Sequence, residues 1–465
     1  MDTRTLFDKI WDAHVIEMFA DDWALLHIDR HLVHDLSGPP ALAELTARHI
    51  PIHSPELTFA TPDHLVSSSP SREVDPQGST SIWAQLRAAA MTAGVKVFDI
   101  DGGNQGIVHV MGPDLGLILP GLTVVCSDSH TCTNGAAGAI ALGVGSSQSA
   151  QVLAAQVLRI QRPRSMRIRI EGPLGNGVTA KDVALHLISK LGTAAGTGRA
   201  IEYAGSTVQA MTMEERLTLC NLSVELGART GIIAPDETTL AWLQGRPYAP
   251  KDHAWDRACS AWRELHTDDD ASFDVDVRIA ATEIVPMVTW GTSPEHGVGI
   301  DGVVPNPRDA PTEAQQRAWG AALDYMGLEP GRPMNGLPID WVFIGSCANS
   351  RLTDLRAAAR IVEGRTVASH ITAWVVPGSE QVRANAEAEG LDQIFTAAGF
   401  QWRAPGCSMC VAANGDRVPP GARCVSTSNR NFVGRQGPMA RTHLASPAMA
   451  AAAALAGALT DVRTQ

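Results

Sequence analysis

The chain has 465 residues, with 37 Lys and Arg against 49 Asp and Glu, so its formal net charge is −12 with His counted as neutral. Hydrophobic residues make up 45% and charged residues 18% of the chain, which is enough to build large cores and excludes a globally disordered protein. The acidic balance argues against a nucleic-acid binder that tracks phosphates, and it requires locally placed arginines to hold any anionic substrate.

From the two ends of the chain we expect neither a secretory signal nor a membrane span. Apolar residues recur at helical spacing from Leu6 to Val15, and Thr5 and Asp8 are placed as a capping pair, so we expect an amphipathic helix there. The longest small apolar run, Ala448–Leu459, has 12 residues and is too short to span a bilayer. We expect a cytoplasmic protein, in which the eight cysteines are thiols or metal ligands rather than disulfides.

Short apolar runs alternate with helical stretches along the chain, which predicts α/β domains with largely parallel sheets. Proline-rich or polar segments at 161–165 and 304–311 suggest boundaries. Three domains, 1–163, 164–306 and 307–465, follow from them, and Ser446-Pro447 should start an Ala-rich helix near the end. The predicted strands are Val95–Ile100, Leu122–Cys126, Met166–Ile170, Val342–Ile344 and Ile371–Val376.

Two cysteine-bearing segments give the strongest local signal. GSCANS, with Cys347, follows a predicted strand directly, and PGCSMC, with Cys407 and Cys410, comes about sixty residues later. Loops at strand ends are where α/β proteins place their sites, so three thiols can meet. Zinc with Cys424 as a fourth ligand, a cubane cluster with one open iron, and buried thiols without metal are the alternatives.

Histidines paired with aspartates form a second group. Asp63 precedes His64, Asp128 stands two residues before His130, and His109 lies in the run GIVHV. A carboxylate beside an imidazole fixes its tautomer and raises its basicity, as general acid–base work on a hydroxyl requires. Each histidine alone could be structural, but three at loop positions favour a site.

The segment STSNRNFVGR forms a third candidate. Arg430 and Arg435 stand five residues apart in a loop that also contains Gly and Asn, and each guanidinium could fork onto a carboxylate. Exposed surface arginines are the alternative interpretation. The short interval after Cys410 favours carboxylate binding at the cysteine site.

Taken together, the segments GIVHVMGP, SDSHTCTNGAAGA, FIGSCANSR, PGCSMC and STSNRNFVGRQG closely resemble the family of 3-isopropylmalate dehydratase large subunits in the aconitase superfamily. Further similarity, from TLFDKIWDAHV to RTHLASPAMAAAAA, extends over essentially the whole chain. The resemblance implies three aconitase-like α/β domains with mainly parallel sheets around a central cluster site, the third domain carrying the cluster cysteines. It also implies that the swivelling fourth domain is lacking and that a separate small subunit carries it, so that the chain is inactive alone.

The resemblance further implies a [4Fe–4S] cluster, one per subunit, held by Cys347, Cys407 and Cys410, and the isomerisation of 2-isopropylmalate to 3-isopropylmalate by dehydration and rehydration in leucine biosynthesis. By matching motifs, the catalytic residues would be Asp63, His64, His109, Asp128, His130 and Glu202, and the substrate-binding residues would be Ser129, Asn429, Arg430, Arg435 and His34. Within these, Glu202 would be the carboxylate that partners one of the histidines.

Several positions depart from the family's usual pattern: Leu65, Asn134, Gln148, Ala150 and Ala348. These departures bear on substrate identity more than on chemistry, so a paralogue for another 2-substituted malate, of homoaconitate or methylmalate type, stays open. A non-catalytic regulator that binds nucleic acid without its cluster is disfavoured by the charge of −12. A zinc-stabilised binding protein is the remaining alternative.

Overall fold

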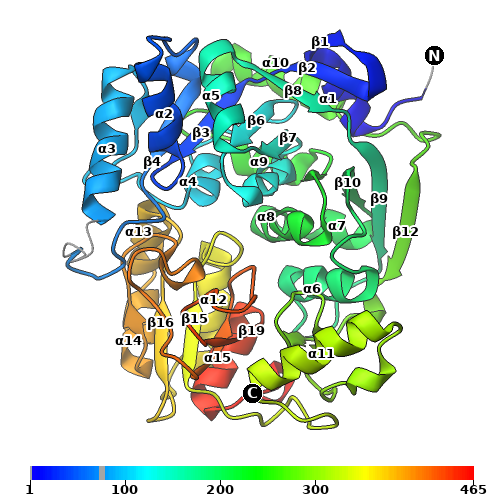
Figure 1. The fold of residues 1–465 in the computed structure, drawn as a ribbon, viewed down its shortest axis with the longest axis vertical. Helices are drawn as coiled ribbons and strands as arrows, with labels where there is room; N and C mark the ends of the chain where they lie inside the picture. Colours follow the sequence, from blue (N-terminus) through cyan, green and yellow to red (C-terminus); the bar gives the residue numbers. More distant parts are fainter. Residues whose placement is uncertain (1–2, 73–78) are drawn as a thin grey trace. The chain divides into compact units, whose positions relative to one another are not determined.

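The structure, a computed structural model, describes residues 3–72 and 79–465 and divides into two compact units (Figure 1). Unit 1 comprises Met1–Asp63, Thr80–Pro173 and Ala194–Ala281, and unit 2 comprises His64–Ser79, Leu174–Thr193 and Thr282–Gln465. All eight cysteines are buried, with no disulfide among the described residues. None of the described helices has both the length and the apolar character needed to cross a membrane.

A parallel sheet of order β5-β4-β3-β6-β7 dominates the first part of unit 1. Helices α2, α3 and α5 lie beside this sheet (Figure 1). Their small and branched apolar side chains share a core cluster with Val33 and Ala60 of the sheet. The bounds are β3 Arg30–His34, β4 Thr58–Thr61, β5 Lys96–Val97, β6 Thr123–Cys126, β7 Ile140–Gly143, α2 Gly38–Ala47, α3 Ser79–Thr92 and α5 Ser146–Ala155.

The predicted opening helix is confirmed as α1, Leu6–His14, with the Thr5–Asp8 capping box in place. It ends at His14, and β1 of the antiparallel sheet β1-β2-β8 begins at Val15. A second parallel sheet has the order β11-β10-β9-β12. The bounds are β1 Val15–Met18, β2 Trp23–His27, β8 Val157–Gln161, β9 Arg164–Glu171, β10 Arg199–Ala204, β11 Thr230–Ile232, β12 Val275–Ala280, α4 Val108–Asp114, α7 Ser206–Ala210, α8 Met213–Asn221, α9 Glu237–Leu243 and α10 Asp252–Arg263.

Unit 2 is built on a parallel sheet of order β17-β16-β15-β18-β19. Helices α12 and α15 pack together beside β15, and Ser446 caps α15 as predicted. The bounds are α6 Ala180–Leu191, β13 Met287–Thr289, β14 Gly297–Gly299, α11 Glu313–Met326, β15 Trp341–Ile344, α12 Leu352–Val362, β16 Thr372–Val375, α13 Glu380–Ala388, α14 Leu391–Ala398, β17 Gln401–Trp402, β18 Arg423–Ser426, β19 Arg441–Leu444 and α15 Pro447–Ala456.

Four of the five predicted strands are confirmed, as β6, β9, β15 and β16. The fifth, Val95–Ile100, is a strand only at Lys96–Val97, because a turn closed by Gly102 N–H donating to Asp99 O bends the backbone away. The division into 1–163, 164–306 and 307–465 stays a prediction, although each of these ranges contains one of the larger sheets.

Candidate functional site

The three predicted cluster cysteines lie in unit 2, in loops that follow strands of the same parallel sheet. Cys347 comes three residues after the end of β15, and the loop after β17 carries Cys407 and Cys410. A 3₁₀ turn, Ser408–Cys410, brings the last two together, since Cys410 N–H donates to Cys407 O at 2.9 Å. All three side chains are buried. This is the edge at which parallel sheets form their sites.

The backbone is strained beside two of these cysteines. Ser346 has φ = 82° and Ser408 has φ = 48°, both in the left-handed region that non-glycine residues avoid. Such conformations cost on the order of 1–3 kcal/mol and persist where surrounding contacts enforce them, as at functional sites. The cysteine loops therefore hold a shape that their local sequence alone does not favour.

Asn429 joins the two cysteine loops. Its Nδ2 donates to the sulfur of Cys347 at 3.2 Å, and its Oδ1 accepts from the thiol of Cys410 at 3.3 Å. Arg435 Nη2 lies 3.8 Å from the Cys410 sulfur, and Arg435 Nε is buried with no hydrogen-bond partner among the described residues. One amide and one guanidinium thus lie beside the sulfur atoms, and the Nε–H of Arg435 is available to donate to a ligand.

Buried polar contacts hold these loops against each other. The Thr427 hydroxyl donates to Gly345 O and accepts from Gly345 N–H, both at 2.9 Å, which ties the loop after β18 to the loop after β15. The fully buried Arg351 donates to Cys347 O at 2.9 Å. Asn431 Nδ2 donates to Gly291 O at 2.6 Å. The structure therefore brings Cys347, Cys410 and Asn429 together.

The segment that begins with His64 is fastened to the same cysteine loop. Asn414 Nδ2 donates to Val66 O at 2.8 Å, and Ser68 Oγ donates to Asp416 Oδ2 at 2.5 Å. His64 itself is buried and belongs to unit 2, whereas the preceding Asp63 belongs to unit 1.

In unit 1, Asp128 connects two of the predicted histidines. Its Oδ1 accepts from the backbone N–H of His130 at 2.7 Å and lies 3.4 Å from His109 Nε2. His130 Nε2 is 3.0 Å from Glu225 Oε1, so this imidazole has a second carboxylate partner. The neighbouring Ser129 is exposed. Asp128 therefore lies beside both histidines, and Glu225 is an additional carboxylate at His130.

Asn134 completes the surroundings of His109. Its Nδ2 lies 3.3 Å from His109 Nδ1 and 3.0 Å from Thr131 O, both buried contacts. Because an amide nitrogen can only donate, this assignment makes Nδ1 the acceptor and directs the Nε2 proton of His109 toward Asp128. Asn134 thus selects one tautomer of His109.

Asp63 and His34 adjoin in unit 1. The Asp63 carboxylate accepts from Val108 N–H at 2.9 Å and lies 3.9 Å from His34 Nδ1, and both side chains are buried. His34 Nε2 is 3.2 Å from Ser127 O. His34 is the last residue of β3, so it too stands at a strand end.

Two sequence predictions are corrected by these contacts. Glu202 does not pair with a histidine: its carboxylate accepts from the Thr267 hydroxyl at 2.6 and 2.8 Å, and burial raises its pKa. Glu225 takes that role at His130, and no spacing or motif in the sequence pointed to it. Cys424, the possible fourth zinc ligand, lies inside β18 in an apolar cluster, where burial raises the pKa of its thiol.

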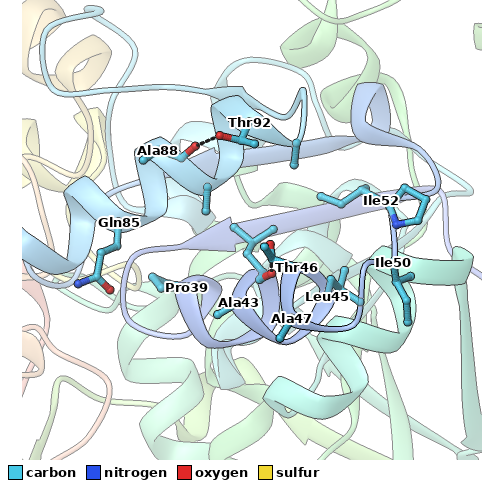
Figure 2. Close-up of a pocket in the computed structure, with 14 residues that line it drawn as sticks. Pro39, Ala43, Leu45, Thr46, Ala47, Ile50, Ile52, Gln85, Ala88 and Thr92 are labelled. Carbon is cyan, nitrogen blue, oxygen red and sulfur yellow. Dashed lines mark hydrogen bonds between the residues drawn. The ribbon is translucent and has the colours of Figure 1, made fainter.

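A separate groove of ≈ 830 Å³ lies in unit 1 between α2 and α3 (Figure 2). The side chains that line it are apolar, apart from threonines and Gln85, and none of them titrates. The groove therefore offers no group for acid–base chemistry, and it contains none of the predicted site residues. Its lining includes Pro39, Leu42, Ala43, Leu45, Ile50, Ile52, Gln85, Ala88 and Thr92.

Comparisons with known proteins identify the family of the chain. Residues 8–457 match the model of the aconitase family (aconitate hydratase). The chain is 59% identical over 461 residues to 3-isopropylmalate dehydratase large subunit 1 of Bradyrhizobium diazoefficiens, covering 99% of this chain and 97% of that protein. Among solved structures, it matches aconitase X of Thermococcus kodakaraensis with a TM-score of 0.47 and 12% identity, over 91% of this chain and 87% of that one. The family match and the identity to the large subunit run along nearly the whole chain, and they show that it belongs to the aconitase family and is a hydro-lyase.

Proposed function

We propose that this chain is the cluster-bearing large subunit of a 3-isopropylmalate dehydratase, which isomerises 2-isopropylmalate to 3-isopropylmalate in leucine biosynthesis. The observation that carries the proposal is the convergence of Cys347 and Cys410 on Asn429, beside Arg435. The identity of 59% to a protein of that name supports the choice of substrate.

Membership of the aconitase family implies an iron–sulfur cluster, and the residues present fit one. Three buried thiols stand in loops at one edge of the sheet, and a side-chain amide and a guanidinium approach two of the sulfurs. We propose a [4Fe–4S] cluster on Cys347, Cys407 and Cys410, with one iron left without a protein ligand. When bound, the cluster supplies a Lewis acid for a substrate hydroxyl or carboxylate.

Carboxylate binding falls to the loop after β18. Arg435 and Arg430 are half-buried, and guanidinium groups recognise carboxylates through paired hydrogen bonds. In a chain with a net charge of −12 these local cations hold a diacid that the protein as a whole repels. Asn429, which contacts the sulfurs of Cys347 and Cys410 and directly precedes Arg430, orients the substrate as well as the sulfur atoms.

Acid–base work falls to the histidines. His64 protonates the departing hydroxyl, and Asp63, its neighbour in the sequence, is held in place by His34 and Val108. His109 and His130 share Asp128, and Glu225 holds Nε2 of His130, so each ring has a defined orientation for proton transfer. The exposed Ser129, whose hydroxyl lies 3.5 Å from His130 Nδ1, contacts the substrate.

The partner proposed for this chain is a small subunit that carries the swivelling domain. The relative with 59% identity is named as a large subunit, which by its name has a smaller counterpart. A cytoplasmic location, expected because iron–sulfur ligands need reduced thiols, is part of the same proposal.

Cysteine variants test the cluster directly. Cys347→Ala, Cys407→Ala and Cys410→Ala should each lose the iron and the visible absorbance of the anaerobically purified chain, whereas Cys424→Ala, in the core of β18, should keep both. Stoichiometric zinc without iron in the unmodified chain would instead identify a zinc-stabilised binding protein.

A substrate panel tests the reaction. The chain, co-expressed with the small-subunit candidate, is assayed on 2-isopropylmalate and on other 2-substituted malates, including those of homoaconitate and methylmalate type. Highest kcat/KM on 2-isopropylmalate supports the proposal, and preference for another malate identifies a paralogue. No activity on any of them, with an intact cluster and bound partner, would refute a hydro-lyase function.

A further inference from the structure

Lys181 is a buried cation in an unfavourable position. It lies in the first turn of α6, has no exposed surface, and donates from Nζ to Thr427 O at 2.9 Å and to Ser428 O at 2.7 Å. The first turn of a helix disfavours positive charge because the helix dipole is positive there. Removing an ammonium group from water costs several kcal/mol more unless an opposite charge compensates it.

No such compensation is in contact with it. Within the described part of the chain, no carboxylate forms an ion pair with Lys181. The adjacent Asp182 instead accepts hydrogen bonds from Met287 N–H and from Thr179, at 2.7 and 2.8 Å. Asp354 is engaged by Arg351 N–H and Asn349 Nδ2.

The groups whose charge acts on Lys181 are, in order, Cys410, Asp354, Cys347 and Asp182. Burial lowers the pKa of Lys181 to about 8, the response expected of a cation without a contacting carboxylate, and it leaves the ammonium charged at neutral pH. The two carbonyls that Lys181 holds directly precede Asn429, which contacts the sulfurs of Cys347 and Cys410.

We propose that Lys181 is a positioning residue for the iron–sulfur cluster, whose ammonium group provides the counter-charge for the cluster and its thiolate ligands and fixes the backbone before Asn429. This inference rests on the proposed cluster. An iron–sulfur core bound by three thiolates carries net negative charge, and the charge around a cluster is one of the factors that set its reduction potential. The metal centre therefore supplies negative charge close to Lys181, which no carboxylate contacts among the described residues.

Substitutions at Lys181 can distinguish the effect of its positive charge from the effect of its side-chain length. Lys181→Met keeps the length of the side chain without its charge, Lys181→Gln keeps an N–H donor without the charge, and Lys181→Arg keeps the charge. Lys190→Met is the matched control, because Lys190 lies on the same helix but is exposed and pairs with Glu283. All four are compared with the unmodified chain after anaerobic cluster reconstitution.

Two measurements are made on the loaded chain: the reduction potential of the cluster, by redox titration followed by electron paramagnetic resonance, and the rate of iron loss to a chelator. Removing a nearby positive charge disfavours the reduced cluster, so Lys181→Met and Lys181→Gln should shift the redox equilibrium about tenfold toward the oxidised form, which is about 59 mV for one electron. Iron loss should accelerate about 10- to 100-fold, as for other residues that support metal ligands. Lys181→Arg and Lys190→Met should stay near the unmodified chain.

The circular dichroism of the metal-free chains shows whether the variants fold. An unchanged potential in both neutral variants would overturn the counter-charge role, and so would neutral variants that fail to fold when the metal-free unmodified chain is folded. Folded neutral variants that cannot retain any cluster, beside a Lys181→Arg variant that can, would support the proposal. Absence of iron from the unmodified chain would refute the cluster itself, and with it the proposed function. Equal reduction potentials in the neutral variants and the unmodified chain would instead refute only the role of Lys181.

Discussion

At the scale of single residues, the structure shows which buried carboxylate lies beside a histidine, a distinction that the sequence could not make. Glu202 and Glu225 are both buried glutamates of unit 1, but of the two only Glu225 contacts an imidazole among the described residues, while Glu202 accepts from the single hydroxyl of Thr267. A carboxylate at His130 fixes the tautomer of the ring, and a carboxylate at Thr267 stabilises only the local fold. The two residues should therefore respond differently to the same substitution.

Glu225→Gln should lower kcat by about 10- to 100-fold, because general acid–base groups contribute about 10²–10⁴ and this change weakens the orientation of one of them. Glu202→Gln, the matched control, should leave kcat within about twofold, since its partner is a hydroxyl. Both are measured as initial rates of the complex with its small subunit. Equal losses in the two variants would contradict the assignment of Glu225.

At the scale of elements, the site depends on how the loop after β18 is joined to the loop after β15. Thr427 provides the connection, because its hydroxyl bonds to both polar backbone groups of Gly345 in a fully buried position. Gly345 directly precedes Ser346, whose left-handed conformation leads into Cys347. The single hydroxyl therefore stabilises a strained turn that carries a cluster ligand.

Thr427→Val should reduce the free energy of unfolding by about 2–4 kcal/mol, because a buried N–H and a buried carbonyl each lose a partner at about 1–2 kcal/mol. Thr427→Ser keeps the hydroxyl and should lose less than half as much. Denaturant titration of both variants checks this, and the iron content of the valine variant should fall in parallel. A valine variant as stable as the serine variant would show that the bridge contributes little.

The junction of α1 with the segment between β2 and β3 should make stability depend on pH. His14 Nε2 lies 2.8 Å from Asp29 Oδ2. Burial opposes the charge of His14, but the hydrogen bonds to Asp29 and Ile10 O outweigh it and raise the pKa of His14. Burial likewise opposes the charge of Asp29, and its bonds to His14 and Thr123 outweigh it and lower the pKa of that carboxyl.

The sign follows from the two shifts. A raised histidine pKa contributes stability that is complete below about 6.5 and is lost as the pH rises through the folded-state value, and a lowered aspartate pKa contributes stability that is lost in acid below about 3.8. His14→Gln should therefore cost more stability at pH 5.5 than at pH 8.5, measured by denaturant titration at both values. A cost independent of pH would show that the pair is not ionic.

At the scale of the whole molecule, the net charge of the chain is negative, whereas the charged side chains at the predicted site are positive. The chain carries a net charge of −12, while the predicted substrate-binding loop presents Arg430 and Arg435 and the cysteine site contains the buried Lys181. Local cations in a negative protein bind a small diacid by contact rather than by long-range attraction. The same charge disfavours the long phosphate backbone of a nucleic acid, which needs an extended basic surface.

The proposed heterodimer gives the prediction at this scale. The purified chain, loaded with its cluster, should show no isomerase activity by itself and should gain activity in proportion to added small subunit, up to one equivalent. Size-exclusion chromatography with light scattering should show a one-to-one complex. Full activity of the chain alone, or salt-sensitive binding of RNA by the metal-free chain, would contradict the proposed assembly and favour the alternatives.

Local patterns in the sequence determined several helices, strands and caps of this protein. The Thr5–Asp8 capping box, the apolar strands β6, β9, β15 and β16, and the N-cap at Ser446 depend on residues a few positions apart, so the sequence by itself determined them. The cysteines and the loop of Asn429 were also identifiable, because in parallel sheets the loops after the strands converge at one edge.

Contacts between distant segments were decided only by the tertiary structure. Glu225 reaches His130 across 95 residues, and Lys181 reaches Thr427 across 246. Asp63 and His64, adjacent in the sequence, belong to different compact units. The hydrogen-bond partner of a buried group depends on which elements pack together. Burial makes a partner necessary but does not specify where in the chain that partner lies, so no local spacing in the sequence predicts it.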